Sequence, residues 1–275
     1  MRDKLLQMEY FETYYYANIV HTILNNRIDF GRNLNNWHED SEVELFLQPF
    51  SKFSVLHEFA YFVITSVMYE NMDNIALDEI AKNPMSQLWV DNALHRHGIH
   101  TQGFRGWLQE KSISLDKIME KHVQHYYEDL DSTGQIHELI NHLSDEVFYI
   151  LFGNRLLLAN LNEYISWIVK DMEKDYLDSE HISLLQKDGV PARVNIPKWV
   201  RRAVFFRDRG MCATCNRDLS GLVTVESPKH FDHIIPLAQG GINDVTNIQL
   251  LCEKCNLSKG RKPLTTSNRY EAWYT

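Results

Sequence analysis

The chain has 275 residues, of which 44% are hydrophobic and 12% aromatic, and its formal net charge is −9 at pH 7. This apolar content excludes a disordered protein, and the length allows one large domain or two smaller ones. No apolar run reaches the roughly 20 residues that a membrane-spanning helix needs. The amphipathic start does not resemble a signal peptide. We therefore expect a cytoplasmic protein without a membrane partner.

Apolar residues recur at helical spacing through most of the front of the chain. This spacing predicts helices over residues 5–24, 51–70, 84–96, 114–130, 135–152 and 155–176. Asn and Asp residues are frequent in 27–42, where we expect a loop. We find no strand-like alternation and no internal repeat. Residues 1–187 are therefore predicted to form an all-α domain.

The composition changes near Lys187. The residues Gly189, Pro191 and Pro197 lie in a short basic stretch that we interpret as a linker. From Pro191 onward the chain has a net charge of +6, whereas the preceding residues have a net charge of −15. The basic tail suits phosphate groups. The acidic front repels nucleic acid, so we expect it to bind a protein partner or to regulate the tail.

The tail, residues 188–275, is predicted to contain both helices and strands. We expect a short helix over 199–208, strands over 222–226 and 231–237, and a second short helix from Glu253. A loop is expected over 238–246. The whole chain is therefore assigned to the α+β class, with an all-α domain before a small ββα domain.

All four cysteines lie in the tail, as two C-x-x-C pairs: Cys212 with Cys215, and Cys252 with Cys255. In a reducing compartment such pairs favour metal binding over disulfides. The spacing allows both thiolates of each pair to reach one tetrahedral zinc ion. Four thiolates leave no position for water, so we expect a structural Zn²⁺ that staples a small domain.

The residues between and around these pairs form a second pattern. It combines the lead-in RDRGMCATC, the sequence DHIIPL, a GG pair, an Asn before the second pair, and CN-x-x-K within that pair. From Asn195 to the end, the chain resembles the HNH (ββα-metal) endonuclease family. The resemblance implies a metal-dependent nuclease domain and does not extend to the front of the chain.

The chemistry of phosphodiester hydrolysis explains the residue types in this pattern. His233 has an imidazole that can take a proton from water near neutral pH, and we expect it to be the general base. Asp232 offers an anionic oxygen for Mg²⁺ or another divalent ion. By resemblance, Asn247 holds the loop and orients the imidazole, and Asn256 is the second metal ligand. The family often has His at this last position, and Asn favours an ion that prefers oxygen.

Basic residues flank the pattern, and phosphate contacts dominate non-specific binding to nucleic acid. We expect such contacts from Arg207, Lys254, Lys259, Arg261 and Lys262. DNA is preferred as the substrate. RNA cleavage by the same site and a non-catalytic zinc-ribbon binding module are the alternatives. HNH enzymes with accessory domains occur in restriction and anti-phage defence, and the resemblance implies such a role here.

Overall fold

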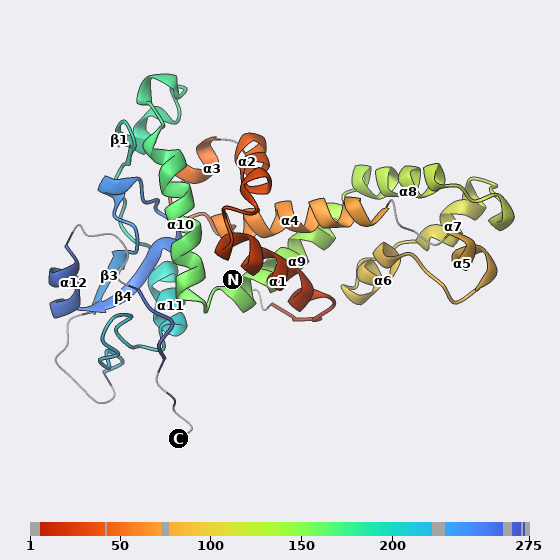
Figure 1. Cartoon of the computed structure of the whole chain (residues 1–275). Helices are drawn as coiled ribbons and strands as arrows, with labels where there is room; N and C mark the ends of the chain where they lie inside the picture. The colour runs from red at the N-terminus through yellow and green to blue at the C-terminus, as the bar shows by residue number, and fades with distance from the viewer. Residues whose placement is uncertain are drawn as a thin grey trace. The chain divides into compact units, whose positions relative to one another are not determined.

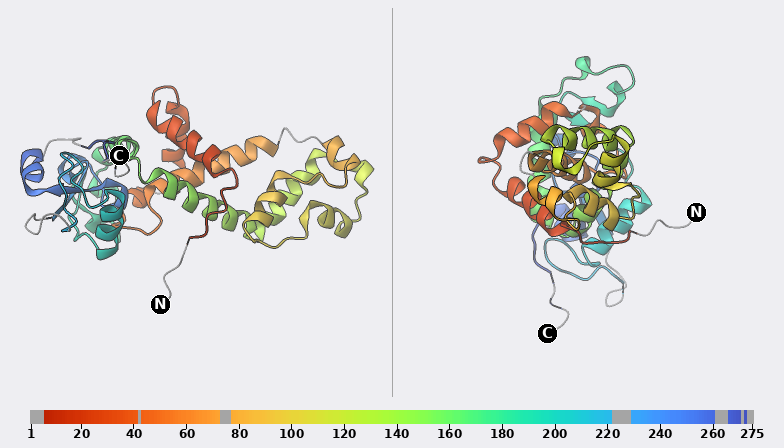
Figure 2. Two further views of the ribbon diagram at one scale, coloured as in Figure 1. Left: turned by 90° about the horizontal axis from the view of Figure 1, so that it is seen from below. Right: turned by 90° about the vertical axis from the view of Figure 1, so that its right-hand side faces the viewer.

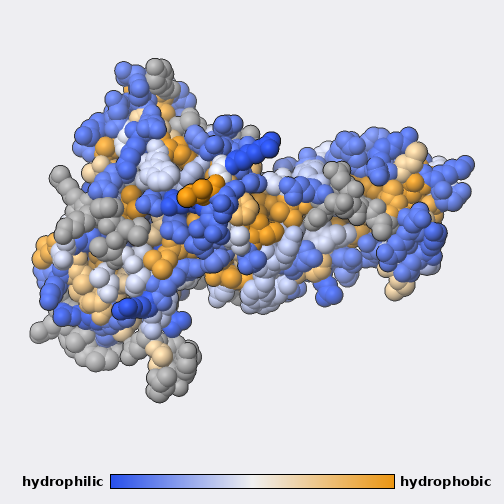
Figure 3. All heavy atoms as spheres, in the orientation of Figure 1, coloured by the Kyte–Doolittle hydropathy of each residue, from blue (hydrophilic) through white to orange (hydrophobic). Residues whose placement is uncertain are grey.

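The computed structural model describes residues 6–41, 43–72, 77–221, 229–260, 266–270 and 272 (Figure 1). It divides into two compact units. The helical unit comprises Met1–Val20 and Phe59–Phe148, and the C-terminal unit comprises His21–Glu58 and Tyr149–Thr275. No helix within the described ranges is long and apolar enough to cross a membrane. On the face shown in Figure 3, polar side chains predominate and apolar ones form separate patches.

The helical unit is built from amphipathic helices. Its elements are parts of α1 (Thr13–Asn25), α4 (Val55–Met72) and α9 (Gln135–Leu151), with α5 (Leu77–Lys82), α6 (Trp89–Arg96), α7 (Gly103–Glu110), a 3-10 turn (Leu115–Lys117) and α8 (Glu120–Ser132). Helix α9 shows why the sequence folds in this way. Its buried residues recur three or four positions apart and form one apolar stripe: Ile136, Leu139, Ile140, Leu143 and Val147.

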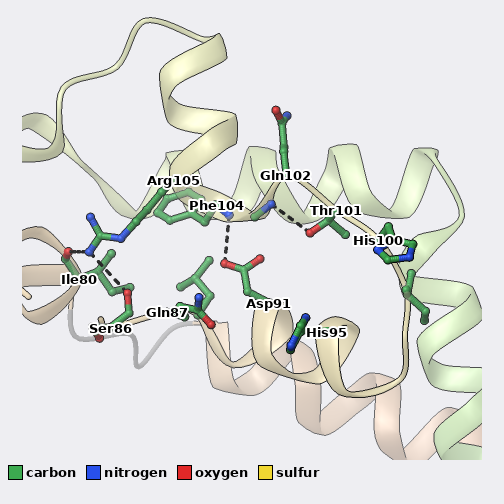
Figure 4. Close-up of a pocket in the computed structure, with 13 residues that line it drawn as sticks. Ile80, Ser86, Gln87, Asp91, His95, His100, Thr101, Gln102, Phe104 and Arg105 are labelled. Atoms are coloured by element: carbon green, nitrogen blue, oxygen red, sulfur yellow. Dashed lines mark hydrogen bonds between the residues drawn. The ribbon is translucent and has the colours of Figure 1, made fainter. Parts of the chain in front are cut away.

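A cavity of about 390 Å³ lies in the helical unit, lined by residues of α6, α7 and the segments before them (Figure 4). Within it, the carboxylate of Asp91 accepts a hydrogen bond of 2.6 Å from the Tyr126 hydroxyl and one of 3.0 Å from the Phe104 backbone N–H. Burial raises the pKa of Asp91. The guanidinium of Arg105 is turned to the backbone, where Nη2 donates to the carbonyl of Asn83 at 2.7 Å. These bonds join α6, α7 and α8 around the cavity.

The C-terminal unit combines helices with two small antiparallel sheets. Its elements are α2 (Gly31–Asp40), α3 (Val43–Leu47), α10 (Arg155–Lys170), β1 (Leu185–Lys187), β2 (Val190–Pro191), α11 (Lys198–Arg207), β3 (Lys229–His233), β4 (Ile248–Cys252) and α12 (Glu253–Lys259). Short 3-10 turns at Lys174–Tyr176, Ile182–Leu184, Leu237–Gln239 and Val245–Asn247 connect them. Strand β3 pairs with β4, and β1 pairs with β2.

Helix α10 lies between α2 and the β3–β4 sheet (Figure 1). It begins at an Asn154 cap, whose side chain accepts a hydrogen bond from the Leu157 backbone. On one side, the Tyr164 hydroxyl donates to the Leu34 carbonyl at 2.9 Å. On the other, Ala159 packs in an apolar cluster with Ile234 and Ile235, which directly follow β3. The helix is therefore buried on more than one face, and it positions the end of β3.

The predicted α+β class is confirmed, with a mostly helical front and small sheets near the C-terminus. The expected strand over 231–237 is shorter, because β3 ends at His233. Its partner is β4, in register with Asp232 opposite Gln249 and His233 opposite Ile248. The other expected strand, over 222–226, lies outside the described residues.

The loop expected over 27–42 is wrong, because α2 occupies most of it. Asn has a low helix propensity, but Leu34 and Trp37 lie three positions apart on one face and both are buried. Tertiary packing of this face overrides the local propensity. The short helices α3, α5 and α7 were also not predicted, since five to eight residues show too little periodicity.

The linker interpretation near Lys187 is also wrong. Strands β1 and β2 form a hairpin there, with Leu185 opposite Pro191. The turn contains Gly189 at φ +65°, and a Cβ at this residue would lie 2.6 Å from the Lys170 carbonyl oxygen. The hairpin is therefore docked on the end of α10. In Figure 1 and in the right-hand view of Figure 2, the chain projects beyond this end of the helix. The expected domain boundary between residues 187 and 188 falls within this hairpin.

Candidate functional site

The four cysteines come together in one cluster. Cys212 and Cys215 follow α11, Cys252 ends β4, and Cys255 lies in α12. Their sulfur atoms all lie within 4.8 Å of one another, and the Sγ atoms of Cys215 and Cys252 are 3.8 Å apart. Tetrahedral coordination with Zn–S bonds of about 2.3 Å requires sulfur atoms about 3.8 Å apart. The cluster therefore fits one structural zinc ion with no open position.

Local backbone geometry forms the first cysteine pair into a turn. The Cys212 backbone N–H donates to the Arg217 carbonyl at 2.9 Å, and the Asn216 N–H donates to the Cys212 carbonyl at 2.9 Å. Asn216 has φ +56°, a left-handed conformation that Asn tolerates better than most residues. Burial raises the pKa of the Cys255 thiol, so a bound cation is needed to hold it as thiolate.

Arg207 lies inside the unit and not on its surface. Its Nε donates to Asp208 at 2.8 Å, and its Nη2 donates to the Ile248 carbonyl at 2.7 Å. Its guanidinium also lies 5.1 Å from the Phe152 ring centroid. Helix α11 turns this residue toward β4, so the structure uses it to join the two elements. The expectation that Arg207 contacts nucleic acid is corrected by this placement.

His233 is the last residue of β3 and is 3% exposed. Its Nε2 lies 3.2 Å from Oδ1 of Asn243, while the Asn243 amide nitrogen donates to the Ala192 carbonyl at 2.8 Å. Because that nitrogen is engaged, the Asn243 oxygen faces the imidazole and accepts a hydrogen bond from Nε2–H. The other ring nitrogen, Nδ1, then has a free lone pair.

The protonation state of His233 follows from its burial. Burial lowers the pKa of His233 to about 4, while the Asn243 hydrogen bond and the nearby Asp232 oppose this shift in part. The imidazole is therefore neutral at pH 7. A neutral imidazole with one free lone pair is the form that can accept a proton.

Asn247 lies 0% exposed beneath the loop that follows β3. Its Oδ1 accepts from the Ile235 N–H at 2.8 Å, and its Nδ2 donates to the carbonyls of Ile235 and Ile242 at 3.1 and 2.8 Å. The loop closes tightly enough that a Cβ at Gly241 would overlap the Ile235 carbonyl oxygen, at 1.9 Å. Asn247 thus holds the loop, and the residue in contact with the imidazole is Asn243.

Asp232 and His233 line one pocket of about 460 Å³ in the C-terminal unit. The Asp232 carboxylate accepts a hydrogen bond of 2.8 Å from Lys259 Nζ, and the Lys259 side chain is 2% exposed. The lysine expected to contact nucleic acid is therefore buried against the expected metal ligand. Its ammonium lies where a cation on Asp232 would bind.

The other expected site residues lie on or beyond α12. Asn256 is half-buried, three residues before Lys259 on the same helix, and Lys254 is exposed. Arg261 and Lys262 lie outside the described residues. The structure thus brings Asp232, His233 and Lys259 into one pocket, and it places Asn256 on the helix that contributes Lys259.

Three residues near His233 were missed by the sequence analysis: Lys187, Arg193 and Asn243. Asn243 follows the GG pair in GGIND, a composition that indicates only a loop. The two basic residues lie in the segment interpreted as a linker. No local signal distinguishes them, because the pocket residues of the HNH segment are about 40 residues or more away in sequence.

Replacing Asn243 tests its contact with the general base. Asn243→Ala leaves His233 Nε2 and the Ala192 carbonyl without their partner, a cost of about 1–3 kcal/mol for each buried group. We expect a lower midpoint of thermal unfolding and lower cleavage per folded, zinc-loaded molecule. Asn36→Ala, at an exposed position of α2, is the comparison. Full cleavage by a stably folded Asn243→Ala protein would show that the contact is dispensable.

Comparison with known families adds one finding. Residues 212–262 match the HNH endonuclease family, and no family model matches the N-terminal region. No curated protein and no solved structure shows significant similarity to the chain. The matched segment includes both cysteine pairs, Asp232, His233, Asn247 and Asn256.

Proposed function

Because the chain carries an HNH endonuclease domain at residues 212–262, we propose that it hydrolyses phosphodiester bonds in DNA with the help of a divalent metal ion. The observation that carries this proposal is one pocket with a neutral imidazole beside a carboxylate. Hydrolysis of a phosphodiester requires an activated water and neutralisation of charge on the leaving oxygen. The imidazole can activate the water, and the carboxylate can hold the cation that would neutralise the charge.

His233 acts as the general base in this proposal. The hydrogen bond to Asn243 keeps one proton on Nε2, so Nδ1 is the nitrogen that takes the proton from the attacking water. The loop held by Asn247 carries Asn243 and thereby keeps the imidazole in one orientation. Little rearrangement of these side chains is then required during the reaction.

Asp232 and Asn256 would hold the divalent ion through oxygen atoms, which suits Mg²⁺ or a similar ion. Such an ion would neutralise developing charge on the phosphate and on the leaving 3′ oxygen. Lys259 competes with it for the Asp232 carboxylate. Lys259 would have to leave Asp232 for this carboxylate to hold an ion, and its ammonium would then be available to a phosphate oxygen.

The zinc site and the basic surface support substrate binding in this proposal. The cysteine cluster fixes β4 and α12, which present Asn256 and Lys259. Lys254, Arg261 and Lys262 are proposed to contact phosphates.

The acidic N-terminal region controls the nuclease or recruits a protein partner, and a role in bacterial restriction or anti-phage defence accords with such control.

The proposal is tested by incubating the purified protein with supercoiled plasmid or with single-stranded RNA, in Mg²⁺ or in EDTA. We expect nicked or linear plasmid in Mg²⁺ only, with zinc retained during a brief EDTA treatment because four thiolates bind it tightly. Cleavage of RNA but not of plasmid would show that the site acts on RNA and not on DNA. Binding without cleavage in Mg²⁺ or Mn²⁺ would leave a zinc-ribbon binding module.

A further inference from the structure

Part of the lining of this pocket comes from residues 185–193, the β1–β2 hairpin and the two residues after it. These residues precede the matched segment 212–262. The hairpin contributes Gln186, Lys187, Val190 and Arg193 to the same pocket that Asp232 and His233 line. A part of the chain that no family assigns therefore completes the space in which the expected chemistry occurs.

The hairpin is held in place by backbone hydrogen bonds on both sides. The Gly189 N–H donates to the Met172 carbonyl at 2.9 Å, and the Ala192 N–H donates to the Leu184 carbonyl at 2.8 Å. The Ala192 carbonyl in turn accepts the bond from Asn243, which also contacts His233. One amide side chain thus connects the hairpin to the imidazole. Arg193, the next residue, is held close to the reacting groups by this connection.

The charges of the hairpin are suited to a polyanion. Lys187 and Arg193 are both exposed, and neither has an ion-pair partner among the residues that the structure describes. The nearby Asp188 accepts a hydrogen bond from the Lys174 backbone. The carboxylate in the pocket, Asp232, is already paired with Lys259. The lining of the pocket therefore includes two cations that make no ion pair with any described residue.

We infer that the 185–193 hairpin is a phosphate clamp, in which Lys187 and Arg193 bind the non-bridging oxygens of phosphates that flank the cleaved one. The inference rests on the proposed function. Such contacts position the backbone of the substrate and carry no sequence information. The scissile phosphate is then held between the hairpin and Asp232, with His233 at its side.

The test compares a Lys187→Ala/Arg193→Ala double variant with a Lys117→Ala/Lys121→Ala control in the full-length protein. The control removes the same charge from two exposed positions of the helical unit. Both pairs are made in a His233→Ala background, and binding of a fluorescent DNA duplex is measured by anisotropy across a salt series without divalent metal. Thermal unfolding and zinc content verify the fold of every variant.

For the hairpin variant we expect roughly a ten-fold or greater loss of affinity, which corresponds to about 1.4 kcal/mol or more of binding free energy. The slope of log K against log salt should fall by about 1.8, because each contact with a B-DNA phosphate contributes about 0.9. The control pair should change the slope by less than half of this amount. With His233 restored, KM should rise more than kcat falls, and Arg193→Lys should retain part of the affinity.

The outcomes separate this inference from the proposed function. If the wild-type protein cleaves DNA but the hairpin variant binds like the control pair, the clamp is refuted and the nuclease assignment stands. If the wild-type protein neither binds nor cleaves nucleic acid, the proposed function fails and the clamp fails with it. A loss of affinity without a change in salt slope would show that the hairpin supports the pocket without contacting phosphates.

Discussion

Replacing His233 with Ala is expected to reduce DNA cleavage by about 10²- to 10⁴-fold, the range typical of a lost general base. The residue is 3% exposed, so removal of its side chain also leaves a small cavity, and the fold must be verified. We expect the variant to retain its zinc and its affinity for DNA, because neither depends on the imidazole. Initial rates of plasmid nicking, measured with saturating enzyme in Mg²⁺, provide the comparison.

The matched control is His230→Ala. This histidine lies on the same strand, three residues earlier, and does not line the pocket. Its replacement should leave nicking within a few-fold of wild type, while His233→Ala loses it. If the two variants nick plasmid at similar rates, His233 is not the general base.

Replacing Cys252 with Ser should unfold the C-terminal zinc region. Cys252 is 2% exposed and joins β4 to α12, so its thiolate connects the sheet to the helix that carries Asn256. Binding of structural zinc contributes about 10–16 kcal/mol to the folding of small zinc domains, which exceeds the stability of most domains. We expect loss of bound zinc, rapid proteolysis after residue 207 and no nuclease activity.

Metal analysis and limited proteolysis measure this effect directly. Wild type should hold about one zinc ion per chain, as four thiolates around one ion require. Ser258→Ala, at an exposed position of α12, is the control and should retain both zinc and protease resistance. A Cys252→Ser protein that lacks zinc yet keeps a protease-resistant tail would show that the cysteine cluster is not a structural staple.

The sequence by itself determined the features that depend on short spacing. Two C-x-x-C pairs predict one tetrahedral site, and the sulfur atoms of the structure do lie within 4.8 Å of one another. The DHIIPL segment predicted a nuclease site at Asp232 and His233, and both residues do line one pocket. Such predictions succeed because the ligand geometry or the reaction chemistry restricts residue types within a few positions.

Only the tertiary structure decided which partner each charged side chain meets. Arg207 and Lys259 look like surface cations in the sequence, but each is buried against a carboxylate, Asp208 and Asp232 respectively. Asn243 contacts Ala192, 51 residues away. The burial of a helix face and the identity of its neighbours depend on packing between distant segments, and no local pattern encodes them.

The same reason explains the hairpin at residues 185–191. Gly189 and Pro191 indicate a turn, which a flexible linker and a hairpin share. Contact with the end of α10 selects the hairpin, because Gly189 fits against the Lys170 carbonyl oxygen where a Cβ would not. The sequence determined the zinc site and the class of nuclease domain, and long-range packing on α10 decided how the rest of the chain completes its pocket.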